Sequence, residues 1–94
     1  MLIRIVRMEF QQDKVEDFLA LFETVENKIA TFPGCTHLQL CRDAKLTHVY
    51  YTFSRWESEE RLDEYRNSPL FEGTWEKTKA MFAGKPLAYS LDPQ

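Results

Sequence analysis

The sequence predicts an α+β domain whose elements follow in the order strand, helix, strand, strand, helix, strand. Three observations indicate this order: an N-terminal run rich in β-branched residues, a long amphipathic helical pattern after it, and a later helical pattern rich in aromatic rings. The chain has 94 residues, 44% of them hydrophobic and 14% aromatic. This is enough for one core, so residues 1–94 are expected to form a single domain.

The first strand and the first helix are predicted from adjacent segments. Residues 2–10 are rich in β-branched and other apolar side chains, which favours a strand. Asp13 and Glu16 have the spacing of a capping box, and apolar residues then recur at helical spacing as far as Ile29. A helix is therefore expected to run to about residue 31.

A hairpin is predicted after the Phe32-Pro33-Gly34 break. Residues 36–42 and 47–55 have strand-like composition, and residues 43–46 provide the turn between them. If the hairpin is symmetric, Cys41 lies directly opposite His48.

Two helical pieces and a last strand are predicted in the remaining part of the chain. Ser58 can cap a short helix that ends near Arg66, and Ser68-Pro69 can start another that runs to about residue 83. Residues 86–91 supply the last strand. The complete order, βαββαβ, is the split pattern of the ferredoxin-like fold.

Alternation along the strands assigns side chains to two faces of the sheet. The face expected to meet the helices carries Leu38, Leu40, Val49, Tyr51 and Phe53. The other face is expected to carry His37, Gln39, Cys41, His48, Tyr50 and Thr52, together with Val6 and Met8. This second surface is too apolar to remain in water, so we expect another subunit to cover it and form a homodimer.

Charge and composition argue against several classes of protein. The formal net charge is −3, and basic residues are scattered among acids, so nucleic acid is not an expected partner. No apolar run approaches the roughly 20 residues that span a bilayer, and the N-terminus has no signal-peptide pattern, so we expect a cytoplasmic protein with no membrane attachment.

The two cysteines and two histidines predict neither a disulfide nor a metal site. Cys35 and Cys41 share one predicted strand, and six residue steps separate their Cα atoms by roughly 20 Å. A disulfide requires a separation below about 7 Å. The absence of CxxC or HxxxH spacing gives no zinc signature.

Several short motifs resemble, in their order and spacing, the antibiotic biosynthesis monooxygenase family. They are the Phe32-Pro33-Gly34-Cys35 turn, the strand end Trp56-Glu57-Ser58, the helix break Tyr65-Arg66-Asn67-Ser68 and the closing Lys85-Pro86. The resemblance covers nearly the whole chain. It implies a dimeric α+β barrel, in which two four-stranded sheets pack face to face.

For function, the resemblance implies several different activities. The superfamily includes oxygenases of aromatic polyketides that use no metal or flavin, haem-degrading enzymes, quinol monooxygenases, and small proteins without an assigned activity. The haem-degrading branch uses an Asn, a Trp and a His, and the matching positions here are Arg7, Tyr65 and Trp75. Because all three differ, haem degradation by that mechanism is not expected, and no cofactor is predicted.

The resemblance implies a pocket between the helices and the sheet, and aromatic residues at helical spacing can line it. The expected substrate is an aromatic or quinol-like compound, which must lose a proton before it reacts with dioxygen. The residues expected to act on it are Arg7 as anion stabiliser, Tyr65, Trp75, and His37 as a candidate base. Tyr51, Phe53, Phe71 and Phe82 are the expected substrate-binding residues.

Other interpretations of the same residues remain open. An aromatic stripe at helical spacing can simply fill a core, and Arg7 can pair with a surface acid. His37 is expected on the face away from the helices, where it can be a hydrogen-bonded residue inside a dimer. A protein that binds a small hydrophobic metabolite without catalysis is the alternative to a monooxygenase.

Overall fold

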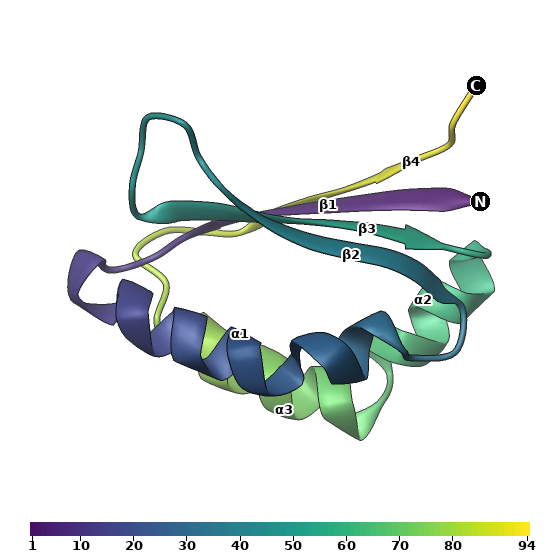
Figure 1. Ribbon diagram of the computed structural model, residues 1–94, viewed down its shortest axis with the longest axis horizontal. Coiled ribbons are helices and arrows are strands. Elements are labelled where there is room, and N and C mark those ends of the chain that lie inside the picture. The colour runs from purple at the N-terminus through teal and green to yellow at the C-terminus, as the bar shows by residue number, and fades with distance from the viewer.

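The computed structural model describes all residues, 1–94, and shows one sheet with every helix on the same face (Figure 1). The elements are β1 (Leu2–Glu9), a 3-10 turn (Gln12–Lys14), α1 (Val15–Ala30), β2 (Cys35–Arg42), β3 (Val49–Trp56), α2 (Glu59–Arg66), α3 (Pro69–Lys79) and β4 (Leu87–Leu91). The opposite face of the sheet carries no helix.

The sheet confirms the predicted fold. Its strand order is β2-β3-β1-β4, and all three pairings are antiparallel. With α1 between β1 and β2 and α2–α3 between β3 and β4, this is the ferredoxin-like α+β arrangement. None of the helices is long and apolar enough to cross a membrane.

Helix α1 is amphipathic as expected, but it begins differently. Phe18, Phe22, Val25 and Ile29 are its buried residues, and their spacing of three and four places them on one face. The predicted capping box is wrong: Asp13 belongs to the 3-10 turn, and no side chain caps α1.

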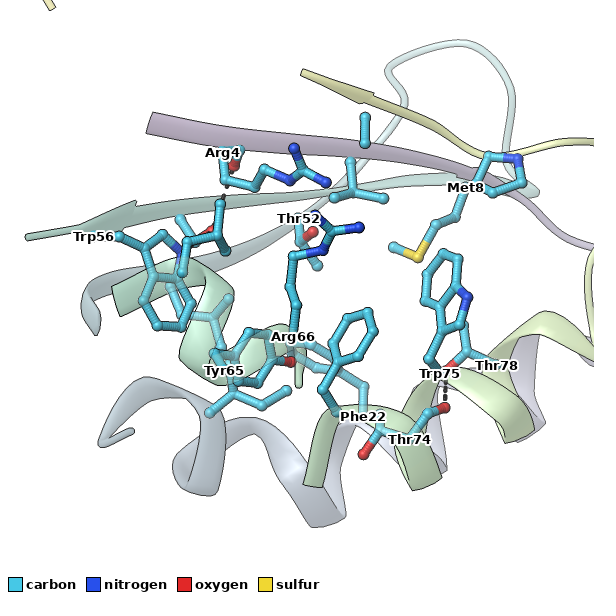
Figure 2. A pocket seen from close by; sticks show the side chains of 18 of the residues that line it. Arg4, Met8, Phe22, Thr52, Trp56, Tyr65, Arg66, Thr74, Trp75 and Thr78 are labelled. Carbon is cyan, nitrogen blue, oxygen red and sulfur yellow. Dashed lines mark hydrogen bonds between the residues drawn. The ribbon is translucent and has the colours of Figure 1, made fainter. Parts of the chain in front are cut away.

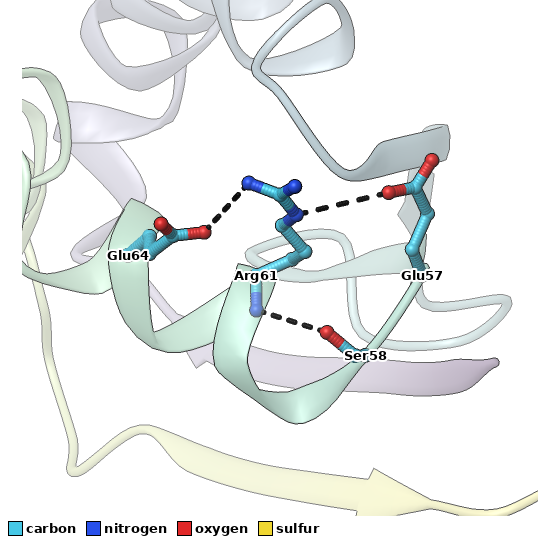
Figure 3. A network of polar contacts seen from close by, with 4 residues as sticks. All are labelled: Glu57, Ser58, Arg61 and Glu64. Carbon is cyan, nitrogen blue, oxygen red and sulfur yellow. Dashed lines mark hydrogen bonds and ion pairs between the residues drawn. The ribbon is translucent and has the colours of Figure 1, made fainter.

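The two later helices begin at the serines that the sequence indicates. The Oγ atom of Ser58 accepts a hydrogen bond from the backbone N–H of Arg61, at 3.2 Å, and Ser68 caps α3 in the same way. Around Ser58, the Arg61 side chain also pairs with Glu57 and Glu64 (Figure 3). The start of α2 is thus fixed by local contacts.

A glycine lets the chain approach α2 closely before β2. Gly34 has φ +93°, and a Cβ at this position would lie 2.6 Å from Cγ of Arg61. Both the left-handed backbone and the lack of space favour glycine. The Gly34 carbonyl accepts a hydrogen bond from the Glu57 N–H, at 2.8 Å, which ties this turn to the end of β3.

Two buried clusters form the core between the sheet and the helices. One contains Met8, Phe10, Phe18, Phe22 and Tyr50. The other contains Leu2, Trp56 and Leu62. The first cluster lies toward the start of α1 and the second toward α2. These buried residues do not fill the space between the two clusters.

The predicted sheet faces are correct for β2 and wrong for β1 and β3. Leu38 and Leu40 face the helices as expected, but their partners on β3 are Ser54 and Thr52, and Val6 of β1 pairs with Thr52. Residues that pair directly share a face. The even-numbered residues of β1 and β3 therefore face the helices, and the odd-numbered ones face outward.

The reversal of these faces follows from the hairpin register. Cys41 pairs with Tyr51 instead of His48, a shift of three positions, and an odd shift exchanges the two faces of a strand. The loop is longer than the expected turn because the Asp43 carboxylate accepts hydrogen bonds from the N–H groups of Lys45 and Leu46. His48 instead lies 3.4 Å from Glu9.

Candidate functional site

A cavity of about 230 Å³ lies between the sheet and the helices, in the space between the two core clusters (Figure 2). Its sheet-side lining is Arg4, Val6, Met8, Leu38, Thr52, Ser54, Trp56 and Ala88. Its helix-side lining is Phe18, Phe22, Ile29, Leu62, Tyr65, Arg66, Phe71, Thr74, Trp75 and Thr78, and Pro86 completes it. Most of this surface is apolar, which suits an organic ligand.

A continuous row of aromatic rings runs along the cavity, and all of its members except Phe82 line it. Trp56 stacks on Tyr65 with ring centroids 5.0 Å apart, and Tyr65 meets the edge of Phe71 at 5.2 Å. Phe71 stacks nearly parallel to Trp75 at 5.8 Å, and Trp75 meets Phe82 at 5.5 Å. The row spans the end of β3, both later helices and the segment after α3.

Trp56 supports this row from within the core. It is 1% exposed, and its indole N–H donates a hydrogen bond to Oγ of Ser54 at 3.0 Å. The Ser54 hydroxyl in turn donates to the Arg4 carbonyl at 3.4 Å. With its polar group satisfied and its ring buried, Trp56 holds the Tyr65 ring in place.

Tyr65 places an unpaired hydroxyl group at the cavity. Its ring is held between Trp56 and Phe71, and the hydroxyl makes no hydrogen bond to the protein (Figure 2). Burial raises the pKa of Tyr65, and the nearby Cys35 raises it further. The hydroxyl therefore stays protonated at neutral pH and can act as a hydrogen-bond donor to a ligand.

Two arginines extend into the same cavity. The guanidinium groups of Arg4 from β1 and Arg66 from the end of α2 both point into it, between the Trp56 side and the Trp75 side (Figure 2). Partial burial, followed by the charge of Arg66, lowers the pKa of Arg4, and the charge of Asp63 opposes this shift. Neither arginine forms an ion pair with a carboxylate; the ion pairs of the chain involve Arg61 and His48.

These two arginines were missed in the sequence, where each resembles an ordinary surface charge. A correct register would have indicated Arg4, since it alternates with Val6 and Met8 along β1. Arg66 directly follows Tyr65 in the last turn of its helix. No pattern of sequence spacing connects residues 62 positions apart.

The structure brings some of the predicted site residues together. Tyr65, Phe71 and Trp75 line the cavity side by side. Phe82 is not part of the lining; it lies behind Trp75 and packs against Phe10, with centroids 5.4 Å apart. Its predicted place in the wall of the cavity is wrong.

Other predicted residues lie on the outer face of the sheet. Arg7 pairs with Tyr51 between β1 and β3, and Phe53 follows Tyr51 on the same face. Their predicted place in the cavity is wrong because of the hairpin register. His37 lies on the outer face as expected, with its ring 6.0 Å from that of Phe53.

A comparison with family sequence models gives one match. The model described as antibiotic biosynthesis monooxygenase matches residues 1–77, more than four fifths of the chain. The chain belongs to this family. As a member of the antibiotic biosynthesis monooxygenase family, it is a monooxygenase-like protein that acts on a small molecule or binds one.

Solved structures share the family fold over the whole chain. A crystal structure of an antibiotic biosynthesis monooxygenase is 18% identical, with a TM-score of 0.94, and the match covers 100% of this chain and 99% of that one. Rv0793 from Mycobacterium tuberculosis is 22% identical, with a TM-score of 0.91 and coverage of 99% and 94%. A conserved protein from Methanosarcina mazei Go1 is 16% identical, with a TM-score of 0.93 and coverage of 100% and 94%.

These similarities describe the fold, because the sequence identities are low. A comparison with curated proteins found no match. The chemistry of this family member must therefore be argued from the cavity itself.

Proposed function

We propose that this protein oxygenates a phenolic or quinol-like compound of one or two rings, without a bound cofactor. The observation that carries the proposal is the cavity in which the aromatic row, the protonated Tyr65 and two guanidinium groups converge. Its volume of about 230 Å³ is below the roughly 300–1,000 Å³ typical of sites for drug-sized ligands, which favours a small ring system.

The reaction uses the substrate as the electron donor. A phenol that loses its O–H proton gains electron density at the para carbon, which reacts with dioxygen to form a carbon–oxygen bond. Loss of water from the resulting peroxide leaves a quinone. One oxygen atom enters the product and the other leaves as water, so that C10H8O2 and O2 give C10H6O3 and H2O for 1,5-dihydroxynaphthalene.

The cavity supports the deprotonated substrate with charge and a hydrogen bond. Arg4 and Arg66 favour the phenolate over the phenol, because a positive charge stabilises the anion and lowers the pKa of the substrate. Tyr65 donates a hydrogen bond to a substrate oxygen, and the parallel rings of Phe71 and Trp75 hold the ring system.

The proton leaves to solvent in this proposal. No Asp, Glu, His or Cys belongs to the cavity lining, and Arg66 is exposed to solvent. The substrates that fit are therefore phenols acidic enough for water or buffer to remove the proton beside two cations.

The same composition favours a second candidate, a protein that binds a small aromatic metabolite without changing it. A site that binds an already ionised molecule needs no general base, and the lining contains no Asp, Glu, His or Cys that could act as one. In that case the arginines and the aromatic row provide affinity, and no dioxygen is consumed.

Oxygen uptake with 1,5-dihydroxynaphthalene separates the two functions. We expect uptake above the protein-free rate, and incorporation of one 18O atom from 18O2 into the quinone. The larger three-ring compound anthrone should react more slowly because it exceeds the cavity. No uptake above the protein-free rate, with clear binding of the compound, would favour the binding protein.

Trp75→Phe is the matched variant for this assay. Trp75 is half-buried, and its ring lines the cavity. The smaller ring of phenylalanine should therefore leave the melting temperature almost unchanged. Loss of stacking area should reduce affinity and uptake by about two- to tenfold. A large loss of stability with unchanged affinity would show that Trp75 serves the core and does not bind the ligand.

A further inference from the structure

The two guanidinium groups in the cavity lack the partner that such groups usually have. Arg61, on the surface, pairs with Glu57 and Glu64 at 3.8 and 3.0 Å. Arg4, by contrast, is half-buried, and its one side-chain partner is the neutral Ser90 hydroxyl, at 2.8 Å from Nη1. Like charges brought together at an apolar wall are unfavourable unless an anion joins them.

One acid of the protein, Asp63, acts on Arg4. Asp63 lies on α2 one turn before Arg66, and its charge reaches Arg4, but it forms no ion pair with either arginine. It is exposed and lies outside the cavity lining. Two cations and one carboxylate outside the lining leave the cavity with a net positive charge.

From this geometry we infer that the cavity is built for an aromatic carboxylate, with the carboxylate held by Arg4 and Arg66 and the ring against Phe71 and Trp75. This inference rests on the proposed function, since it names the class of substrate that enters the same cavity. A guanidinium group presents a planar fork of N–H donors that matches a carboxylate, and two forks can share its two oxygens.

A carboxylate fits the surroundings better than other anions. The lining contains no lysine, and its remaining polar side-chain groups are the indole N–H groups of Trp56 and Trp75 and the hydroxyls of serine, threonine and tyrosine residues. With the carboxylate of Asp63 near the two arginines, a singly charged carboxylate matches the remaining positive charge, whereas the larger charge of a phosphate would be only partly balanced. A phenol that is still protonated would leave both cations without a counter-charge, whereas a carboxylate remains ionised throughout the neutral pH range.

The arrangement also gives the ring a fixed orientation. Arg66 is exposed and lies at the cavity, whereas Arg4 is partly buried against the sheet. A carboxylate bound between them positions the attached ring along the aromatic row, with a hydroxyl group elsewhere on the ring available to Tyr65. The substrate class that fits this arrangement is therefore a hydroxylated aromatic carboxylate of one or two rings.

Titration with 2-naphthoate and 2-naphthol tests the inference, because the two probes share a ring system and differ in charge. Quenching of tryptophan fluorescence in the intact protein reports both. We expect 2-naphthoate to bind at least tenfold more tightly at low salt, and its affinity to fall as salt is added. Arg66→Gln should weaken 2-naphthoate by roughly ten- to a hundredfold, and leave 2-naphthol within about twofold.

Three variants serve as controls. Arg42→Gln removes the same charge from an exposed position outside the cavity, and it should leave both affinities unchanged. Arg66→Lys should recover only part of the 2-naphthoate affinity, because lysine keeps the charge and loses the fork. Arg4→Gln should repeat the Arg66→Gln result, with thermal melts confirming that each variant folds.

Equal weakening of both probes, equal effects of Arg42→Gln and Arg66→Gln, or no binding of 2-naphthoate would overturn the inference. Its outcome is separate from that of the proposed function. Arginine-dependent binding of 2-naphthoate without any oxygen uptake from hydroxylated naphthalenes would leave the carboxylate site standing and remove the oxygenase. Oxygen uptake with neutral phenols, and no preference for carboxylates in binding, would leave the oxygenase standing and remove the carboxylate site.

Discussion

Single residues in the cavity differ in whether the protein itself satisfies their polar atoms. Trp56 and Ser54 form a closed set of hydrogen bonds, and both are buried. The Tyr65 hydroxyl and the Arg66 guanidinium, next to each other in sequence, make no such contact within the cavity. This contrast separates the structural support from the groups that are free to meet a ligand.

The raised pKa of Tyr65 has a consequence for stability at high pH. An unfolded tyrosine loses its proton near pH 10, whereas the folded Tyr65 keeps it at that pH. The contribution of Tyr65 to the free energy of unfolding is thus complete below about pH 10 and is lost as the pH rises above it. The loss amounts to at most about 1.4 kcal/mol per pH unit.

Tyr65→Phe should remove this dependence. Urea unfolding at pH 8 and pH 11 should show the variant gaining stability relative to the wild type at the higher pH. Phe71→Leu, which alters the neighbouring ring without removing a titratable group, should keep the wild-type dependence. Parallel curves for the wild type and Tyr65→Phe would contradict the assigned direction of the pKa shift.

At this scale the sequence indicated the aromatic residues and missed the arginines. Tyr65, Phe71 and Trp75 have helical spacing, which a local pattern captures. Arg4 and Arg66 become neighbours only when β1 and α2 are placed against each other. A charge that faces a cavity and a charge that faces water look alike in a sequence.

At the scale of the elements, the sequence predicted type and order more reliably than register. Ser58 and Ser68 cap their helices as expected, because capping depends on a few adjacent residues. The hairpin register depends on how Asp43 folds its loop, and the resulting shift of three positions moved Tyr51 and Phe53 to the other face.

Ser68 links the two helices that carry the aromatic row. Its Oγ atom accepts a hydrogen bond from the Phe71 N–H at 3.2 Å, and its hydroxyl donates to the Tyr65 carbonyl at 2.6 Å. Ser68→Ala should lower the free energy of unfolding by about 1 kcal/mol and should also weaken 1,5-dihydroxynaphthalene binding, because the rings of Tyr65 and Phe71 lose their fixed spacing. Thermal melts and fluorescence titrations measure the two effects.

Ser58→Ala is the matched control, since it removes the corresponding cap from α2. It should cost a similar free energy and leave affinity nearly unchanged, because Ser58 lies outside the cavity lining. If both variants weakened binding to the same extent, the loss would reflect general destabilisation and not the position of the rings.

At the scale of the whole molecule, the sheet is covered on one face only (Figure 1). The outer face carries large apolar side chains that remain half-exposed or exposed, including Leu87 at 46%, Tyr89 at 51% and Leu91 at 46%. The face is more apolar than expected, since Ile5 and Phe53 face outward, whereas Met8 and Thr52 face the helices. The order of elements predicted the fold, but the character of this surface depended on the register.

We propose that two copies of the chain pair through these outer faces, and that the interface buries well over 1,000 Å² in total, as a stable dimer requires. Light scattering at micromolar concentration should give about twice the chain mass of 11.2 kDa. Tyr89→Asp places a charge on the exposed edge of the face, and it should shift the protein toward the monomer because an unpaired buried charge is costly.

Leu19→Asp provides the control for this shift. Leu19 is 36% exposed on α1, which lies on the helical side of the sheet, so its replacement should leave the dimer intact. Both variants replace a solvent-accessible residue, so any difference between them reports the location of the interface and not a general loss of folding. A species of 11.2 kDa alone in the wild type, or dissociation by Leu19→Asp with an unaffected Tyr89→Asp variant, would place the interface elsewhere or remove it.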